Sequence, residues 1–206
     1  SLRSSIELLL NEKIEAHKKT ELTQNMKNDI DRMNTLINDI SSYTLTQVEI
    51  DDELFSSFDL IIFLKEFLSS YDNNYKNIKI NIEFEEVQAF IYASRNKLAQ
   101  VFINLIENSL SFSPKNSQIL VQQKTSKNNI KILIFDQGIG ISENSKEKIF
   151  ERFYTDRPVD QNEHSGLGLS ISKNIIESFS GSINIVNSKS QQYLGACFEI
   201  NLPLKD

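Results

Sequence analysis

The sequence contains no tryptophan and a single cysteine, and these two shortages already limit what the protein can be. Thirteen phenylalanines supply most of the aromatic residues, so we expect a core built mainly of Phe and Ile. Cys197 has no second cysteine to pair with, so an internal disulfide is excluded and a reducing compartment is favoured.

Long apolar runs and an excess of positive charge are also missing. No stretch reaches the roughly 18 to 20 apolar residues that a membrane-spanning helix needs, and there is no signal-peptide pattern. The first residue is Ser1 rather than Met, so we expect a fragment, with any membrane segment lying upstream. The formal net charge of −6 argues against a nucleic-acid partner.

The 206 residues are enough for one full-sized domain and a smaller element. Residues 1–50 predict a helical hairpin whose second helix has apolar residues spaced alternately by three and four. These residues are Leu22, Met26, Ile30, Met33, Ile37, Ile40 and Tyr43. One hairpin cannot bury this seam alone, so we expect a homodimer in which two hairpins form a four-helix bundle. A hairpin folded back onto its own domain is the alternative.

Residues 51–57 are acidic and contain serine, which predicts a linker, and residues 58–206 remain for the second domain. Hydrophobic periodicity predicts helices at 61–71, 97–112 and 170–179. It predicts strands at 78–84, 89–92, 119–125, 130–135, 183–187 and 196–202. Helices segregated from a mostly antiparallel sheet define an α+β fold, here a two-layer α/β sandwich.

The most informative helix runs from Lys97 to Phe112. Its apolar residues have the spacing of a buried amphipathic helix, and Asn104 and Asn108 lie four apart on one face. Two uncharged amides on so apolar a helix indicate a polar ligand on that side. A surface or capping role for each amide is the alternative.

Asp136 ends a predicted strand and is followed by Gly138 and Gly140, which allow backbone conformations that other residues avoid. An acid in this place can accept a hydrogen bond from the exocyclic amine of adenine, while the glycines let the base approach the main chain. Asp and Gly also form ordinary turns at strand ends, so this motif alone is weak.

Two later segments extend the pattern. Residues 148–158 are aromatic and basic and precede a polar loop, which predicts a hinge and lid whose Arg152 or Arg157 reaches phosphate oxygens. A small satellite core is the alternative. Gly166 and Gly168 precede a predicted helix, so free N–H groups at its positive end can hold phosphates. A tight turn packed on the sheet is the alternative there.

In order and spacing, these segments resemble the ATP-binding domain of bacterial sensor histidine kinases, in the wider family of gyrase, Hsp90 and MutL. The matching motifs are the N box at 104–108, the G1 box at 136–140, the F box at 149–153 and the G2 box at 165–169. Several shorter segments are similar to ChvG-type kinases of alphaproteobacteria. The resemblance covers about 58–203 and implies the histidine kinase ATPase fold, with residues 1–48 as part of the dimerisation and phosphoacceptor hairpin.

The resemblance implies ATP and Mg²⁺ as cofactors. Asn108 would coordinate the metal, with Asn104 beside it as a second catalytic residue, and Asp136 would read adenine. The other implied nucleotide contacts are Phe112, Lys115, Gly138, Gly140, Tyr154, Ser165, Gly166, Leu167 and Gly168. Many kinases have basic residues where Ser111 and Thr155 stand, so Lys115 or Arg157 would replace them near the γ-phosphate. His164 stands where these kinases commonly have another glycine.

The resemblance also implies an acceptor histidine upstream of Ser1, because His17 is a poor match for it and His164 lies in the predicted lid. We therefore expect the catalytic portion of a two-component sensor histidine kinase that is unable to phosphorylate itself on the usual residue. Its phosphoryl group would pass to a histidine and then to a response regulator, ChvI-like if the narrower similarity holds. The expected location is the cytoplasmic portion of a bacterial inner-membrane sensor, joined to the membrane through upstream segments.

Two other functions remain open. A gyrase-like or MutL-like ATPase would carry a Glu where Asn104 stands, and an amide cannot act as a general base. A nucleotide-free dimeric scaffold would have no use for Asp136 and Asn108.

Overall fold

The computed structural model describes residues 17–27, 30, 55–74, 79–155, 166–188 and 190–205. Residues 17–27 are helical. Most of the predicted hairpin and residues 51–54 of the predicted linker lie outside the described residues, as do Arg157, His164 and Ser165. The four-helix bundle and the dimer therefore stay predictions.

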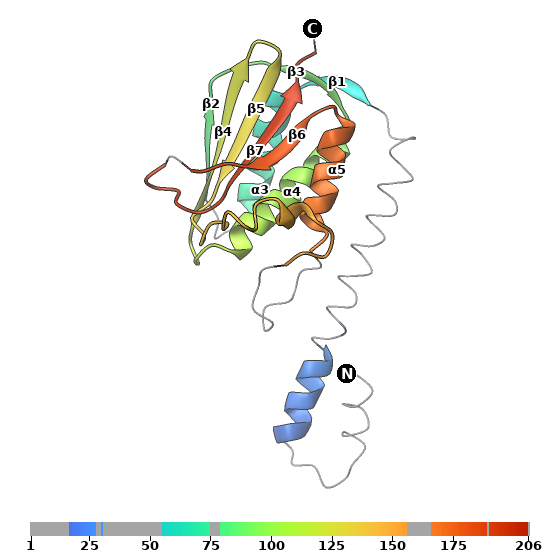
Figure 1. Cartoon of the computed structure of the whole chain (residues 1–206), viewed down its shortest axis with the longest axis vertical. Helices are drawn as coiled ribbons and strands as arrows, with labels where there is room; N and C mark the ends of the chain where they lie inside the picture. Colours follow the sequence, from blue (N-terminus) through green and yellow to red (C-terminus); the bar gives the residue numbers. More distant parts are fainter. Residues whose placement is uncertain are drawn as a thin grey trace.

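Residues 55–205 form two layers, a five-stranded sheet and a layer of helices (Figure 1). The strand order is β2-β4-β5-β7-β6, with β2 pairing parallel to β4 and the other neighbours antiparallel. The strands are β2 (Lys79–Phe84), β4 (Gln118–Ser126), β5 (Asn129–Phe135), β6 (Ser182–Ile185) and β7 (Cys197–Pro203). The helices are α3 (Leu60–Asn74), α4 (Arg95–Ser111) and α5 (Gly168–Ser178), with a short 3-10 turn η1 (Lys148–Phe150). This architecture confirms the predicted α+β class.

The sheet has a core on each face. Alternate residues of β4, β5 and β7 point toward the helices and form the main core with them, including Ile132, Ile134 and Phe198. A smaller cluster under the loop after β6 contains Tyr193 and Cys197. The helices therefore cover only one face of the sheet.

A separate two-stranded sheet joins β1 (Ser56–Asp59) to β3 (Phe90–Ala93) in antiparallel register. The sequence did not predict β1, and two of its residues lie in the predicted linker. One carboxylate oxygen of Asp59, Oδ1, accepts the backbone N–H groups of Ile61 at 2.8 Å and Ala89 at 3.2 Å. Asp59 thus caps the start of α3 and ties it to the chain entering β3.

Helix α4 buries one face against the main core and carries two of the candidate site residues. Ser94 caps its first turn by accepting the Lys97 N–H at 3.3 Å. Phe102 and Leu105 are fully buried, and burial of such a side chain contributes about 1.5 to 3 kcal/mol. Asn104 and Asn108 lie on the half-buried side of the same helix.

Helix α5 is followed by a residue in the left-handed backbone conformation that often ends a helix. That residue is Ser180, with φ of 59°, and the Gly181 N–H donates to the Ile176 carbonyl at 3.0 Å. A Cβ at Gly181 would lie 2.5 Å from the Asn201 carbonyl oxygen, so glycine is required there for close packing on β7. Among the helices that the structure describes, none is long and apolar enough to cross a bilayer.

Candidate functional site

Asp136, directly after β5, is 2% exposed and held by the backbone around it. Its Oδ1 accepts the N–H of Gly138 at 2.9 Å and the N–H of Ala196 at 2.8 Å. The Asp136 carbonyl accepts the Gly195 N–H at 3.1 Å. One carboxylate oxygen is thus used by the protein itself, and Oδ2 is the oxygen that can face a ligand. We call residues 136–140 the Asp136 turn.

The buried hydroxyl of Ser109, on α4, lies near this carboxyl. Ser109 is fully buried, and its Oγ makes no hydrogen bond of good geometry within the described structure. Burial raises the pKa of Asp136 above its ordinary value, although the bonds from Gly138 and Ala196 and the nearby Ser109 lower it. A buried acid beside an unsatisfied hydroxyl is a pair of groups suited to a polar ligand.

Two glycines make the close packing of the Asp136 turn possible. A Cβ at Gly138 would lie 2.8 Å from the Phe112 carbonyl oxygen, so the turn packs directly against the end of α4. A Cβ at Gly195 would overlap Asp136 Oδ1 and lie 2.5 Å from the Gly138 nitrogen. The sequence analysis missed Gly195, whose only local signal is a glycine directly before the predicted closing strand.

Asn108 lies on α4 close to the Asp136 turn. Its carbonyl accepts the Phe112 N–H at 3.3 Å and the Ser111 hydroxyl at 2.8 Å. Its half-buried side-chain amide forms no hydrogen bond with another residue that the structure describes. The amide oxygen can therefore serve as a ligand for a hard cation such as Mg²⁺.

Asn104 reaches in another direction, toward the first turn of α5. Its Nδ2 donates to the Gly168 carbonyl at 3.1 Å and to Ser172 Oγ at 3.3 Å. The buried Leu167 precedes this turn, so the N-terminus of α5 is held both by packing and by the amide of α4. We call residues 166–168 the Gly166 turn.

The Gly166 turn also touches the aromatic segment before the predicted lid. Gly166 has φ of 72°, and a Cβ on it would lie 2.7 Å from the Tyr154 carbonyl oxygen. The Phe153 N–H donates to the Gly166 carbonyl at 3.1 Å, and the Tyr154 hydroxyl bonds Ser145 at 3.2 Å. The predicted glycine and aromatic motifs thus meet in the fold.

The structure does not bring every predicted residue together. Gly140 has φ of 76° and lies at the far side of the Asp136 turn, where its Cβ position is 3.8 Å from Gly195. Lys115 is exposed in the turn after α4. Arg157 and Ser165 lie outside the described residues.

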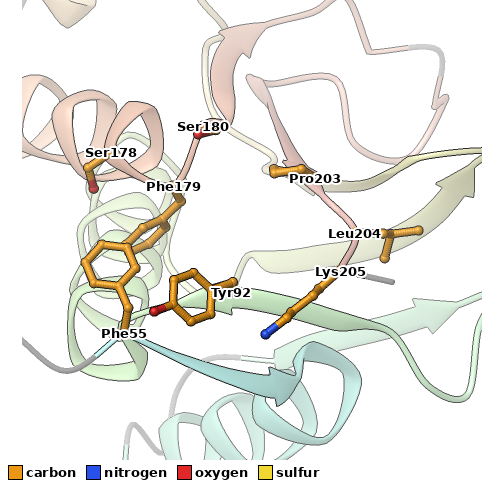
Figure 2. A pocket seen from close by; sticks show the side chains of 8 residues that line it. All are labelled: Phe55, Tyr92, Ser178, Phe179, Ser180, Pro203, Leu204 and Lys205. Carbon is orange, nitrogen blue, oxygen red and sulfur yellow. The ribbon is translucent and has the colours of Figure 1, made fainter.

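A hollow of about 460 Å³ lies at the C-terminal end of α5, the opposite end from the Gly166 turn (Figure 2). Its walls include Phe55, Tyr92 and Phe179, and the Lys205 ammonium lies 4.8 Å from the centre of the Tyr92 ring. None of the predicted nucleotide-binding residues lines it. The predicted glycine motif at 166–168 lies at the other end of this helix.

Comparison with known proteins identifies the family of the chain. Residues 93–206 match the Histidine kinase-, DNA gyrase B-, and HSP90-like ATPase family, and the chain belongs to that family. It is 33% identical over 216 residues to Sensor protein ChvG of Agrobacterium fabrum, a match that covers 98% of this chain and 36% of ChvG. The resemblance to ChvG-type sensor kinases is therefore confirmed, and the chain spans about a third of the length of that relative.

Solved structures show the same fold. The catalytic domain of histidine kinase ThkA in a nucleotide-free form has a TM-score of 0.63 at 27% identity, covering 73% of this chain and 95% of that one. Histidine kinase ThkA in complex with response regulator protein TrrA gives a TM-score of 0.72 at 22% identity, covering 99% of this chain and 57% of that one. The chain thus contains the ATPase-type domain of a sensor histidine kinase.

Proposed function

We propose that this chain is the catalytic portion of a two-component sensor histidine kinase that binds Mg-ATP. It would supply the γ-phosphoryl group to a histidine outside these 206 residues, and a response regulator aspartate would receive it next. The observation that carries the proposal is the Asp136 carboxyl, which is buried, fixed through Oδ1 by two backbone N–H groups, and accompanied by an unsatisfied Ser109 hydroxyl.

The Asp136 turn fits adenine. With Oδ1 occupied, Oδ2 of Asp136 would accept a hydrogen bond from the exocyclic amine, and Ser109 would pair with a ring nitrogen directly or through a water. Gly138 would leave the main chain open to the base. An apolar ligand would leave both buried polar groups unsatisfied, which costs about 1 to 3 kcal/mol for each.

Asn108 and the Gly166 turn fit the metal and the phosphates. Mg²⁺ commonly binds one or two protein oxygens together with substrate phosphates, and the Asn108 amide oxygen would be such a ligand. The N-terminus of α5 after Gly166 would direct backbone N–H groups and the positive end of the helix dipole toward phosphate oxygens. Bound Mg²⁺ would neutralise charge on the transferred group.

Asn104 favours a phosphotransferase over a hydrolase. An amide has no basic site with which to activate water, and the Asn104 nitrogen already donates to α5. Bound ATP would therefore turn over slowly in the absence of its acceptor, far below the typical rate of about 10 per second for enzymes.

The activity of the whole protein is part of the same proposal. Residues 1–50 would form the homodimer, and a response regulator, ChvI-like by the similarity to ChvG, would be the second partner. Histidine kinase ThkA has been solved with its regulator TrrA, which supports a regulator as the partner class. The location proposed for this portion is the cytoplasmic side of a bacterial inner membrane.

The test combines binding with phosphotransfer. Calorimetric titration of the chain with Mg-ATP should show a single site, and Asp136→Asn should weaken it. Joining the chain to its upstream helix with the acceptor histidine should give an acid-labile, base-stable phosphoryl label. Asn108→Ala should abolish this label and His17→Ala should leave it intact. Brisk ATP hydrolysis by the chain alone, or labelling of His17, would contradict the proposal.

A further inference from the structure

The orientation of the Asn104 amide follows from its partner. The Gly168 carbonyl can only accept a hydrogen bond, so the amide nitrogen and not the oxygen of Asn104 faces α5, 3.1 Å away. Ser172 Oγ donates its single proton to the same carbonyl at 2.9 Å. Toward Asn104, 3.3 Å away, this hydroxyl can therefore act only as an acceptor.

Both partners of Asn104 thus require a hydrogen-bond donor on the side chain at position 104. A carboxylate at position 104 would place its lone pairs against the Gly168 carbonyl and repel it, and Ser172 Oγ could bond the carboxylate only by giving up its own hydrogen bond to that carbonyl. Ser172 is fully buried, so solvent cannot relieve that conflict easily. A hydroxyl too short to span the gap, or an alanine, would leave the contact unmade. The local chemistry of α5 therefore selects an amide at this position.

The contact between Asn104 and Gly168 lies between the candidate metal ligand and the candidate phosphate-binding turn, which would act on one nucleotide. Asn104 and Asn108 are one turn apart on α4, and Asn108 faces the candidate metal position. Gly168 is the first residue of α5, whose N-terminus faces the candidate phosphate position. Fixing Gly168 to α4 therefore fixes the phosphate-binding N–H groups relative to the metal ligand.

We propose that Asn104 is a positioning residue that holds the first turn of α5 through the Gly168 carbonyl, and is not itself a ligand of Mg²⁺ or phosphate. This inference rests on the proposed nucleotide site, and it reassigns the role that the family resemblance implies for Asn104. Ser172 takes part in the same contact, because its hydroxyl donates a hydrogen bond to the same Gly168 carbonyl oxygen.

A positioning residue and a metal ligand predict different losses of nucleotide affinity when Asn104 is replaced by alanine. If Asn104 only positions α5, Asn104→Ala should weaken ATP binding about tenfold whether or not Mg²⁺ is present, because the phosphate-binding turn is loosened in both cases. Adenosine, which has no phosphates, should bind as in the wild type. A direct metal ligand would instead lose affinity only in the presence of Mg²⁺.

The experiment measures dissociation constants by calorimetry for adenosine, ATP with EDTA and Mg-ATP. The proteins are the wild type, Asn104→Ala, Ser172→Ala, the double variant and Asn108→Ala as the control for a metal ligand. The double variant should be about as weak as Asn104→Ala, since both side chains act on one carbonyl. A loss confined to Mg-ATP for Asn104→Ala, or two losses that multiply fully, would overturn the proposal.

Hydrogen exchange provides a readout that needs no nucleotide. Amides of 168–178 should exchange faster in Asn104→Ala than in the wild type, whereas Asn108→Ala should leave them unchanged. Unchanged exchange would overturn the positioning role. If the wild type binds no nucleotide, the proposed function fails, while this measurement still decides whether Asn104 holds α5. Should Asn104→Ala fail to fold, Ser172→Ala tests the same carbonyl.

Discussion

The candidate site has two sides, the Asp136 turn and the Gly166 turn, and the glycines of the two sides have different surroundings. Gly195 packs against the Asp136 turn, and a Cβ on it would overlap the Asp136 carboxylate. On the Gly166 turn, a Cβ at Gly168 would lie 3.6 Å from the Asn104 side chain, which is an ordinary contact. Around Gly195, backbone packs directly against backbone, whereas at Gly168 one helix is tied to another by a side chain.

This difference indicates which amino-acid substitutions each side can tolerate. Backbone atoms around Asp136 are fixed by strand pairing between β5 and β7, so they cannot move away from an added methyl group. Side chains between α4 and α5 can adjust by rotation. We therefore expect the position of Gly195 to be sensitive to added volume, and the contact between Gly168 and Asn104 to be sensitive to a lost hydrogen bond.

Gly195→Ala should have the largest effect. Its methyl group would meet Asp136 Oδ1 and the Gly138 nitrogen, so either the turn or β7 must shift, at a cost above about 3 kcal/mol in the free energy of unfolding. Urea unfolding followed by circular dichroism measures this cost. An unchanged unfolding midpoint would show that the position of Gly195 tolerates added volume as well as the position of Gly168 does.

Asp136→Asn should separate ligand recognition from folding. The amide oxygen can still accept the Gly138 and Ala196 N–H groups, so the fold should persist, while affinity for ATP falls roughly tenfold to a hundredfold. Asp136→Ala should in addition lower the free energy of unfolding, because it leaves the Gly138 and Ala196 N–H groups without their hydrogen-bond acceptor. Calorimetry and urea unfolding measure the two quantities. Full ATP affinity in a folded Asp136→Asn protein would remove Asp136 from the site.

The pH dependence of stability should reveal the burial of Asp136. Its pKa is raised in the folded protein, so the folded state binds this proton more tightly than the unfolded state does. The resulting stabilisation is fully present below the unfolded pKa of about 3.9 and is lost as pH rises through the folded pKa. Relative to Asp136→Asn, the wild type should lose about 1.4 kcal/mol for each unit by which the pKa is raised. If the free energy of unfolding changed with pH in the same way in both proteins, the raised pKa of Asp136 would be contradicted.

Gly168→Ala should have the smallest effect on stability. The added methyl group fits beside Asn104, and alanine favours a helix over glycine by up to about 1 kcal/mol. The free energy of unfolding should therefore change by no more than about 1 kcal/mol, in contrast to Gly195→Ala measured in the same urea series. A large destabilisation would mean that the position of Gly168 is closed to added volume, as the position of Gly166 is.

The sequence predicts the fold well where periodicity is strong and poorly where a contact between distant segments decides the structure. Strands such as β4 and β5 alternate clearly, and their hairpin forms as expected. Strand β1 is short and rich in serine, and it becomes a strand only by pairing with β3, more than thirty residues later in the chain. The parallel pairing of β2 with β4 likewise has no local signal.

The same distinction holds for the candidate site. Asp136 and Asn108 can be singled out because an acid before glycines and an amide on an apolar helix are unusual locally. Gly195 is recognised only when folding brings it against Asp136, and the contact of Asn104 joins residues 64 positions apart. Periodicity and local composition carry no information on such pairs.

The small β1–β3 sheet has a mechanical consequence. Tension carried by the chain ahead of β1 would load a strand of only four residues, and then the Asp59 carboxylate that caps α3. Because β3 runs through Ser94 straight into α4, the same load would pass to the helix that carries Asn104 and Asn108. Force applied at the start of the domain thus has a short, stiff path to the amides of the candidate site, without passing through the five-stranded sheet.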